Sequence, residues 1–244
     1  SHGDASEAAA AIRAMAGRVD GLLILSPYLE SNFLSMARTR APVVLMNARS
    51  SEFPAFAIDN YGGALAMGSH LSALGYRRIA HIGGPADNFD AQERLRGYRA
   101  ALAKQRPRLD ALVEAGDFSE ESGYAAGKRL LARSQRPDAI FAANDMMAIG
   151  CLFALTEAGV GVPGEIALAG FDDIPIARFV TPPLTTVHVD IADMGRRALD
   201  ALNLSIEGST ARGRFAATLP TELVIRASCG GRTKYSHNAI GEMP

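Results

Sequence analysis

The chain lacks the features that are typical of membrane-anchored, secreted or nucleic-acid-binding proteins. No apolar run approaches the roughly eighteen residues that a membrane-spanning helix requires. No signal peptide precedes the first predicted helix, so we expect a cytoplasmic protein, although a mature exported protein would also lack its signal. The formal net charge of -1 does not indicate a basic surface, so we do not expect this chain itself to bind nucleic acid.

Residues that form disulfides or hold metals are also scarce, since there are only two cysteines and five histidines. Cys151 and Cys229 are far apart and lie in or beside apolar runs, which favours buried thiols over a disulfide or a metal pair. The histidines show no metal-ligand spacing, so we expect no metal and no cofactor. A P-loop, a G-x-S-x-G elbow and a convincing nucleophile–base pair are missing as well. The sequence therefore predicts a protein that is not an enzyme.

What is present is an ordinary core-forming composition, with 48% apolar and 21% charged residues in a chain of 244. Short apolar runs alternate with segments of helical periodicity, an order that predicts an α/β fold with doubly wound parallel sheets. The predicted strands are Leu22–Leu25, Val43–Met46, Phe56–Asp59, Ile79–Ile82, Leu112–Ala115, Ile140–Ala143, Ile166–Ala169, Thr186–Asp190 and Leu219–Arg226. The predicted helices run from Asp4 or Ser6 to Ala16, from Ser31 to Arg38, through Leu65–Leu74, and over Gln92–Leu102, Ser119–Ala132, Asp145–Ala158 and Ile191–Ile206.

Three strands without a helical partner indicate a division into two lobes, because they look like crossings between them. They are Phe56–Asp59, Thr186–Asp190 and Leu219–Leu223. We therefore expect an N-terminal lobe of residues 1–58 and 189–218, a C-terminal lobe of 59–188 and 219–232, and a tail of 233–244. Only two clear strands precede the first crossing, fewer than a sheet usually has, so the N-terminal lobe is expected to be truncated.

One glycine-rich segment, Gly159–Gly164, satisfies the dinucleotide-binding pattern G-x-G-x-x-G. That motif works only where it follows a strand and opens a helix. Here it follows a predicted helix and precedes a predicted strand. We interpret it as a helix stop and a turn.

Polar pairs follow two of the predicted strands: Asn144-Asp145 after Ile140–Ala143, and Asp172-Asp173 after Ile166–Ala169. In open parallel sheets, ligands bind beyond the carboxyl ends of the strands. Asp145 is expected to cap the helix that follows, which leaves Asn144 as the ligand candidate. Of Asp172 and Asp173, one is compatible with a turn position and at least one is expected to face the crevice.

Arg94 is predicted to lie in the first turn of a helix, where the macrodipole disfavours a cation. A partner is therefore expected, such as Asp172 together with ligand oxygens. Aromatic residues near these polar groups (Tyr28, Phe141 or Phe171) would stack on the apolar faces of a ring. This combination favours a polyhydroxylated ligand.

Six segments follow one another along the chain: Asp59–Pro85, Ala91–Leu102, Phe141–Gly150, Gly161–Asp173, Thr181–Val187 and Leu219–Cys229. Together they resemble the signature of the LacI/GalR transcriptional regulators. The resemblance covers about Val19 to Cys229 and implies a two-lobed, periplasmic-binding-protein-like type I effector domain that forms a homodimer. It also implies a helix-turn-helix headpiece that precedes this domain and binds operator DNA; we expect that headpiece, and the first strand, helix and second strand of the N-terminal lobe, to be absent from this chain.

By motif match, the resemblance places Arg94 at the ligand-clamping arginine, Asp172 at the aspartate of the G-F-D loop, and Asn144 before the aspartate of N-D. Four more residues fall where members vary their ligand contacts or where many members carry Asp. The former are Phe141, Asn88 and Asp90, and the latter is Asn47.

The implied function is sensing of a sugar or related small-molecule effector, bound in the cleft between the lobes, by a transcriptional regulator. The alternative is a stand-alone solute-binding protein of a transporter, which has the same fold and cleft. Upstream sequence would distinguish the two, because a helix-turn-helix supports the regulator and a signal peptide supports the transporter.

Overall fold

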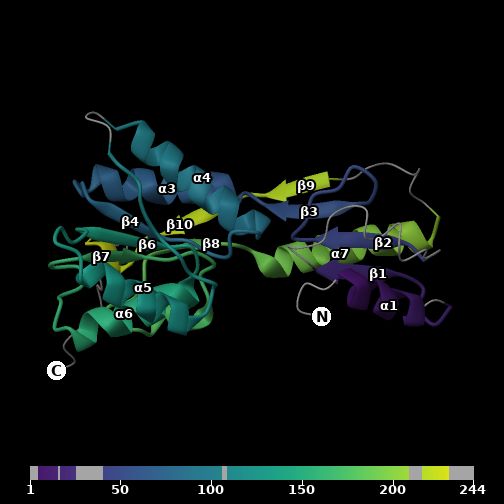
Figure 1. The fold of residues 1–244 in the computed structure, drawn as a ribbon. Coiled ribbons are helices and arrows are strands. Elements are labelled where there is room, and N and C mark those ends of the chain that lie inside the picture. Colours follow the sequence, from purple (N-terminus) through teal and green to yellow (C-terminus); the bar gives the residue numbers. More distant parts are fainter. Residues whose placement is uncertain (1–4, 16, 26–40, 106–108, 209–215, 231–244) are drawn as a thin grey trace, which may run out of the picture. The chain divides into compact units, whose positions relative to one another are not determined.

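The computed structural model describes residues 5–15, 17–25, 41–105, 109–208 and 216–230. The chain forms two compact units (Figure 1). Unit 1 consists of Ser1–Asp59, Asp87–Asp90 and Val189–Thr221, and unit 2 of Asn60–Ala86, Ala91–His188 and Glu222–Pro244. No helix in the described ranges is long and apolar enough to cross a membrane.

Unit 1 contains a four-stranded parallel sheet in the order β1-β2-β3-β9. Its strands are β1 (Leu22–Leu25), β2 (Val43–Met46), β3 (Ala55–Ile58) and β9 (Ala216–Leu219). Two helices pack on it, α1 (Ala5–Met15) and α7 (Ile191–Ile206). Helix α7 presents Met194, Ala198 and Leu202 to the interior, a spacing that follows the 3.6-residue period of a helix.

Unit 2 contains a second four-stranded parallel sheet, in the order β5-β4-β6-β7. Its strands are β4 (Ile79–Ile82), β5 (Leu112–Glu114), β6 (Ala139–Ala142) and β7 (Ala167–Ala169). A separate antiparallel pair joins β8 (Thr186–His188) to β10 (Glu222–Val224). The helices are α3 (Asn60–Ala73), α4 (Phe89–Ala103), α5 (Glu120–Leu131) and α6 (Asp145–Glu157), with 3-10 turns at Pro175–Arg178 and Ala227–Cys229.

Helices α5 and α6 pack closely because glycines stand where their backbones meet. A Cβ atom at Gly123 would overlap the carbonyl oxygen of Met147, and one at Gly150 would overlap that of Glu120. Side chains from both helices then join the core of unit 2, among them Leu130, Cys151 and Leu155 on the helices and Ile140 and Leu168 on the strands.

The predicted α/β fold with parallel sheets is confirmed. Three strands have the predicted bounds, namely Leu22–Leu25, Val43–Met46 and Ile79–Ile82. The segment Gly159–Gly164 lies between α6 and β7, with Gly159 at φ 69°, so the reading as a helix stop and turn is confirmed. Both cysteines are free and buried, as predicted.

One strand was predicted wrongly. The sequence indicates a single strand over Leu219–Arg226, but the structure has β9 in the sheet of unit 1 and β10 in the antiparallel pair of unit 2. Pro220 stands between them and has no N–H to donate to a ladder, which ends the first strand. Tyr28 and the helix predicted over Ser31–Arg38 lie outside the described residues.

Candidate functional site

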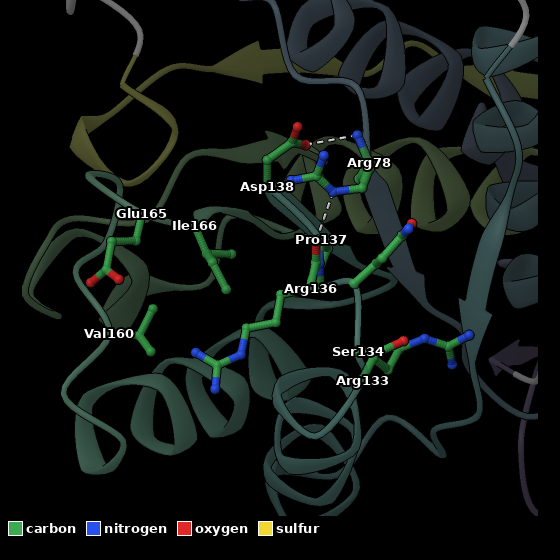
Figure 2. A pocket seen from close by; sticks show the side chains of 10 residues that line it. Arg78, Arg133, Ser134, Arg136, Pro137, Asp138, Val160, Glu165 and Ile166 are labelled. Atoms are coloured by element: carbon green, nitrogen blue, oxygen red, sulfur yellow. Dashed lines mark hydrogen bonds between the residues drawn. The ribbon is translucent and has the colours of Figure 1, made fainter.

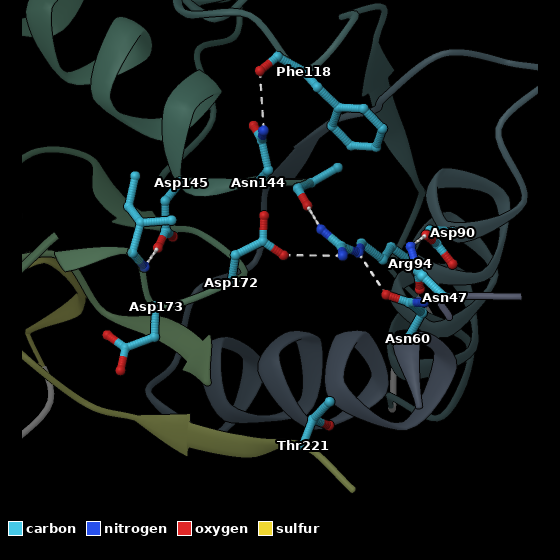
Figure 3. Close-up of polar contacts among 12 residues, drawn as sticks. Asn47, Asn60, Asp90, Arg94, Phe118, Asn144, Asp145, Asp172, Asp173 and Thr221 are labelled. Atoms are coloured by element: carbon cyan, nitrogen blue, oxygen red, sulfur yellow. Dashed lines mark hydrogen bonds and ion pairs between the residues drawn. The ribbon is translucent and has the colours of Figure 1, made fainter. Parts of the chain in front are cut away.

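Arg94 of α4 is held in a buried position by three parts of unit 2 (Figure 3). Its Nε donates to Oδ1 of Asn60 at 2.8 Å, where α3 begins. Its Nη1 donates to the carbonyl oxygen of Ala143 at 2.6 Å, just beyond β6. Its Nη2 lies 3.0 Å from Oδ1 of Asp172, in the loop after β7. The predicted pairing of Arg94 with Asp172 is confirmed.

The expected position of Arg94 in the first turn was wrong. Helix α4 begins at Phe89, whereas the sequence predicted a start at Gln92. Arg94 therefore lies in the second turn, and its contacts, rather than the macrodipole, account for its burial.

Two aromatic rings flank the guanidinium group of Arg94. The centroid of the Phe171 ring lies 3.8 Å from Arg94 Cζ, and that of Phe118 lies 6.0 Å away. Phe171 is fully buried, so its face is desolvated where cation–π attraction is strongest. Phe118 adopts a positive φ of 74° in the segment that follows β5. Sequence reasoning missed Asn60 and Phe118, although Phe118 also follows a strand and the rule for strand ends would have drawn attention to it.

Asn144, and not Asp145, caps helix α6. The Oδ1 atom of Asn144 accepts a hydrogen bond from the backbone N–H of Met147 at 2.9 Å, and its Nδ2 donates to the carbonyl oxygen of Phe118 at 3.0 Å. The predicted cap at Asp145 was wrong because the helix begins at Asp145 itself, one residue earlier than a cap at that position requires. The Asn144 amide thereby links the start of α6 to the segment beyond β5.

Asp145 is fully buried and holds the loop after β7. Its Oδ1 accepts from Thr186 Oγ1 at 2.6 Å, and its Oδ2 accepts from the backbone N–H of Ile174 at 3.0 Å. Burial raises the pKa of this carboxyl to about 7, and the nearby Asp172 and Asp173 act in the same direction. Gly170 lies so close that a Cβ atom there would overlap Oδ1 of Asp145.

The two adjacent aspartates of this loop have different partners. Both adopt positive φ, 106° for Asp172 and 54° for Asp173, a region that residues with side chains rarely occupy. Asp172 pairs with Arg94, while Asp173 accepts from Arg226 Nη2 at 2.6 Å and lies 3.0 Å from Nδ1 of His188. The strained turn therefore directs the two carboxylates to different parts of unit 2.

Of the remaining candidates, Asn47 and Asp90 come together in unit 1, where the Asn47 amide donates to the Asp90 carboxylate. Asn47 Oδ1 is buried and has no partner among the residues that the structure describes. Asn88 is also buried in this unit. Phe141 does not belong to the polar cluster: its ring is fully buried in unit 2 and packs against that of His81, with centroids 5.0 Å apart. Contact of these four residues with an effector stays a prediction.

The cluster around Arg94 consists of hydrogen-bond donors, carboxylates and aromatic faces. Such a set can orient hydroxyl groups and cover an apolar ring face. Within the described ranges, no group of three or more His, Cys, Asp or Glu side chains is arranged to hold a metal ion.

Comparison with known proteins shows the family to which this chain belongs. Residues 69–229 match the periplasmic binding protein-like domain, so the chain is a protein of that class. The ribose operon repressor of Escherichia coli (strain K12) is 40% identical over 194 residues, which are 77% of this chain and 58% of the repressor. The solved complex of the transcriptional regulator CelR with cellobiose is 34% identical, with a TM-score of 0.81, over 92% of this chain and 69% of that chain. A dimeric Lac repressor with a C-terminal deletion is 30% identical, with a TM-score of 0.83, over 92% of this chain and 83% of that chain.

The chain belongs to the LacI/GalR family, whose effector-binding domain it matches. It spans less than two thirds of the length of the ribose operon repressor.

Proposed function

We propose that this chain is the effector-sensing part of a transcriptional regulator, and that its effector is a sugar or a related polar metabolite. The observation that carries the proposal is the pair Arg94–Asp172 at the carboxyl edge of the unit 2 sheet. The relatives support the same function, since one is named a ribose operon repressor and another is a transcriptional regulator solved in complex with cellobiose. Binding, and not catalysis, is the proposed activity, and it requires no cofactor.

The pair has donors and an accessible acceptor for hydroxyl groups. A guanidinium group has five N–H donors, and Arg94 directs three of them to Asn60, Ala143 and Asp172. The other two N–H groups, on Nη1 and Nη2, supply donors for an effector. The side chain of Asp172 is 35% exposed while that of Arg94 is 6% exposed, so an arriving hydroxyl reaches the carboxylate first. Phe171 and Phe118 supply the apolar faces beside it.

Contacts of this cluster lie next to three of the points where the chain passes from one unit to the other, near Asp59, His188 and Thr221. Asn60, which binds Arg94, is the first residue after one of these points. Asp173 contacts His188 at the second, and Arg226 shortly after the third. We propose that effector binding at Arg94 and Asp172 acts on the rest of the protein through these contacts. An effector does so only if its affinity differs between two states of the protein.

Operator DNA is proposed to be bound by a helix-turn-helix headpiece outside this chain, in a regulator that works in the cytoplasm. The net charge of -1 is consistent with DNA contact elsewhere in the protein. We also propose that the regulator is a homodimer, as the similar Lac repressor is. Large apolar side chains on α6 and the turn Pro175–Arg178 support this: Phe153 is 63% exposed, Ile176 49% and the adjacent Phe179 72%.

The test is thermal unfolding with a panel of pentoses, hexoses, disaccharides, polyols, sugar phosphates and purines. A compound that binds the folded chain raises the unfolding temperature. The shift should disappear in Asp172→Asn, which keeps the shape of the side chain and removes its charge. For the compounds of the panel that carry no phosphate group, a shift that survives in Asp172→Asn would contradict the proposed site. The rival, a solute-binding protein of a transporter, would gain support if the full-length protein bound ligand and no operator.

A further inference from the structure

A cavity of about 760 Å³ opens in unit 2, and Figure 2 shows the side chains that line it. It lies at the edge of the sheet opposite to the Arg94 cluster. Its walls include the residues that directly precede three strands: Arg78 before β4, Asp138 before β6 and Ile166 before β7. Because the strands are parallel, the amino ends meet at one edge and the carboxyl ends, with Ala143 and Asp172, at the other. The cavity is therefore separate from the proposed effector site.

Two guanidinium groups at this cavity are anchored without being neutralised. The Nε of Arg78 donates to the carbonyl oxygen of Arg136 at 2.9 Å, and the Nε of Arg136 donates to that of Leu131 at 2.9 Å. Each contact fixes the base of the group and leaves its two terminal nitrogens for another partner. Within the part of the chain that the structure describes, neither arginine forms an ion pair. The third arginine, Arg133, is different, because it pairs with Glu114 at 3.1 Å.

The two carboxylates of the cavity already have backbone partners. Asp138 accepts hydrogen bonds from the backbone N–H groups of Arg77 and Arg78, at 2.9 to 3.2 Å. Glu165 accepts from the backbone N–H of Gly161 at 2.8 Å. Amide donors of this kind stabilise the negative charge of a carboxylate, so these groups are held by the backbone and do not pair with Arg78 or Arg136.

We propose that this cavity is a second ligand site, which binds a small molecule that carries a phosphate monoester. Arginine forms paired N–H contacts with phosphate oxygens, and Arg78 and Arg136 have such donors to offer. The hydroxyl of Ser134 adds another donor, and Val160 and Ile166 add an apolar surface for the carbon skeleton. The volume lies within the range of about 300–1,000 Å³ that is usual for small-molecule sites, which argues for a metabolite over a macromolecule.

Isothermal titration tests the site with two phosphate probes, inorganic phosphate and glucose 6-phosphate, and with glucose as the uncharged probe, all at one ionic strength. Saturable binding of glucose 6-phosphate is expected. The double variant Arg78→Gln/Arg136→Gln should weaken it about tenfold or more, since charge-assisted contacts are lost. The matched control is Arg196→Gln, an exposed arginine on α7 in unit 1, which should leave binding unchanged. Unfolding temperatures without ligand show whether the variants fold.

A further variant, Asp172→Asn, separates the two sites. Phosphate binding that persists in Asp172→Asn and is lost in the double variant supports the second site. Loss in Asp172→Asn with retention in the double variant would place the phosphate at the effector cluster and overturn the proposal. No saturable binding of either phosphate probe by the unmutated chain, or equal weakening in Arg196→Gln, would overturn it as well. The effector panel is read independently, so either proposal can fail alone.

Discussion

Asn60 Oδ1 accepts a 2.8 Å hydrogen bond from Nε of Arg94, and both side chains are buried. This contact joins the first residue of α3 to the arginine that carries the proposed effector site. Substitution Asn60→Ala would leave the Nε–H of Arg94 without its acceptor in a buried position. We expect the free energy of unfolding to fall by about 1–3 kcal/mol.

Urea denaturation measures this effect, with Asn203→Ala on the exposed side of α7 as the control. The control should change stability little, because surface substitutions usually lie within about 0.5 kcal/mol. Equal effects of the two substitutions would show that the Asn60 contact contributes nothing to stability.

The close approach of α5 and α6 predicts opposite effects for two glycine-to-alanine substitutions. In Gly150→Ala, the new Cβ would overlap the carbonyl oxygen of Glu120, so we expect a loss of about 1–3 kcal/mol. In Gly195→Ala, in the interior of α7, the new Cβ meets no atom within 4 Å, so we expect a gain of about 0.4–1 kcal/mol. Thermal unfolding of both variants decides the point, and a Gly150→Ala protein as stable as the parent would contradict the described packing.

Asp145 predicts a pH dependence of stability. Burial raises its pKa in the folded chain from 3.8 to about 7, so the folded state holds this proton over a pH range in which the unfolded state has released it. The contribution of Asp145 to stability therefore falls as the pH rises from about 4 to about 7, by at most about 4 kcal/mol. Asp145→Asn does not titrate. The unfolding free energy of the parent minus that of the variant should fall from pH 4.5 to pH 7.5, as measured in urea.

A constant difference across that range would show that Asp145 has an ordinary pKa in the folded chain. The comparison with Asp145→Asn is needed because other carboxylates titrate in the same interval, and their contributions cancel in the difference.

The exposed apolar side chains of unit 2 predict how the proposed dimer responds to charge. Phe179→Glu, at a position 72% exposed, should shift the protein toward monomer in sedimentation velocity at micromolar concentration. Leu199→Glu, at an exposed position on α7, is the control and should leave the dimer intact. A dimer that persists in Phe179→Glu would exclude this surface as the interface.

The sequence predicted the sheets well because several of their strands, such as β3, β4 and β6, are buried on both faces. Short runs that are mostly apolar, such as Val43–Met46 and Ile79–Ile82, have few alternatives, and their bounds were predicted without error. Helix starts were less predictable. Ser119 was recognised as a start and caps α5, whereas α4 begins three residues before the predicted start at Gln92.

The site was predictable only in part. The polar residues that directly follow strands identified Asn144 and Asp172. The expectation that Arg94 needs a carboxylate partner identified the pair Arg94–Asp172. How neighbouring polar groups divide their hydrogen bonds could not be predicted, since that depends on backbone geometry such as the positive φ of Asp172 and Asp173. For the same reason the sequence predicted that Asp145 caps helix α6, whereas Asn144 does so. Asn60 was likewise not recognised as a partner of Arg94.

The central claim, that an effector bound at Arg94 and Asp172 controls a regulator, is tested most directly by operator binding of the full-length protein. Operator affinity is measured by fluorescence anisotropy with and without a compound that stabilises this chain, in the parent and in Asp172→Asn. We predict that the compound changes operator affinity in the parent by about 5- to 150-fold, the usual range of allosteric coupling, and that Asp172→Asn abolishes the change while it still binds operator. An operator affinity that is the same with and without the bound compound in the parent would contradict the account.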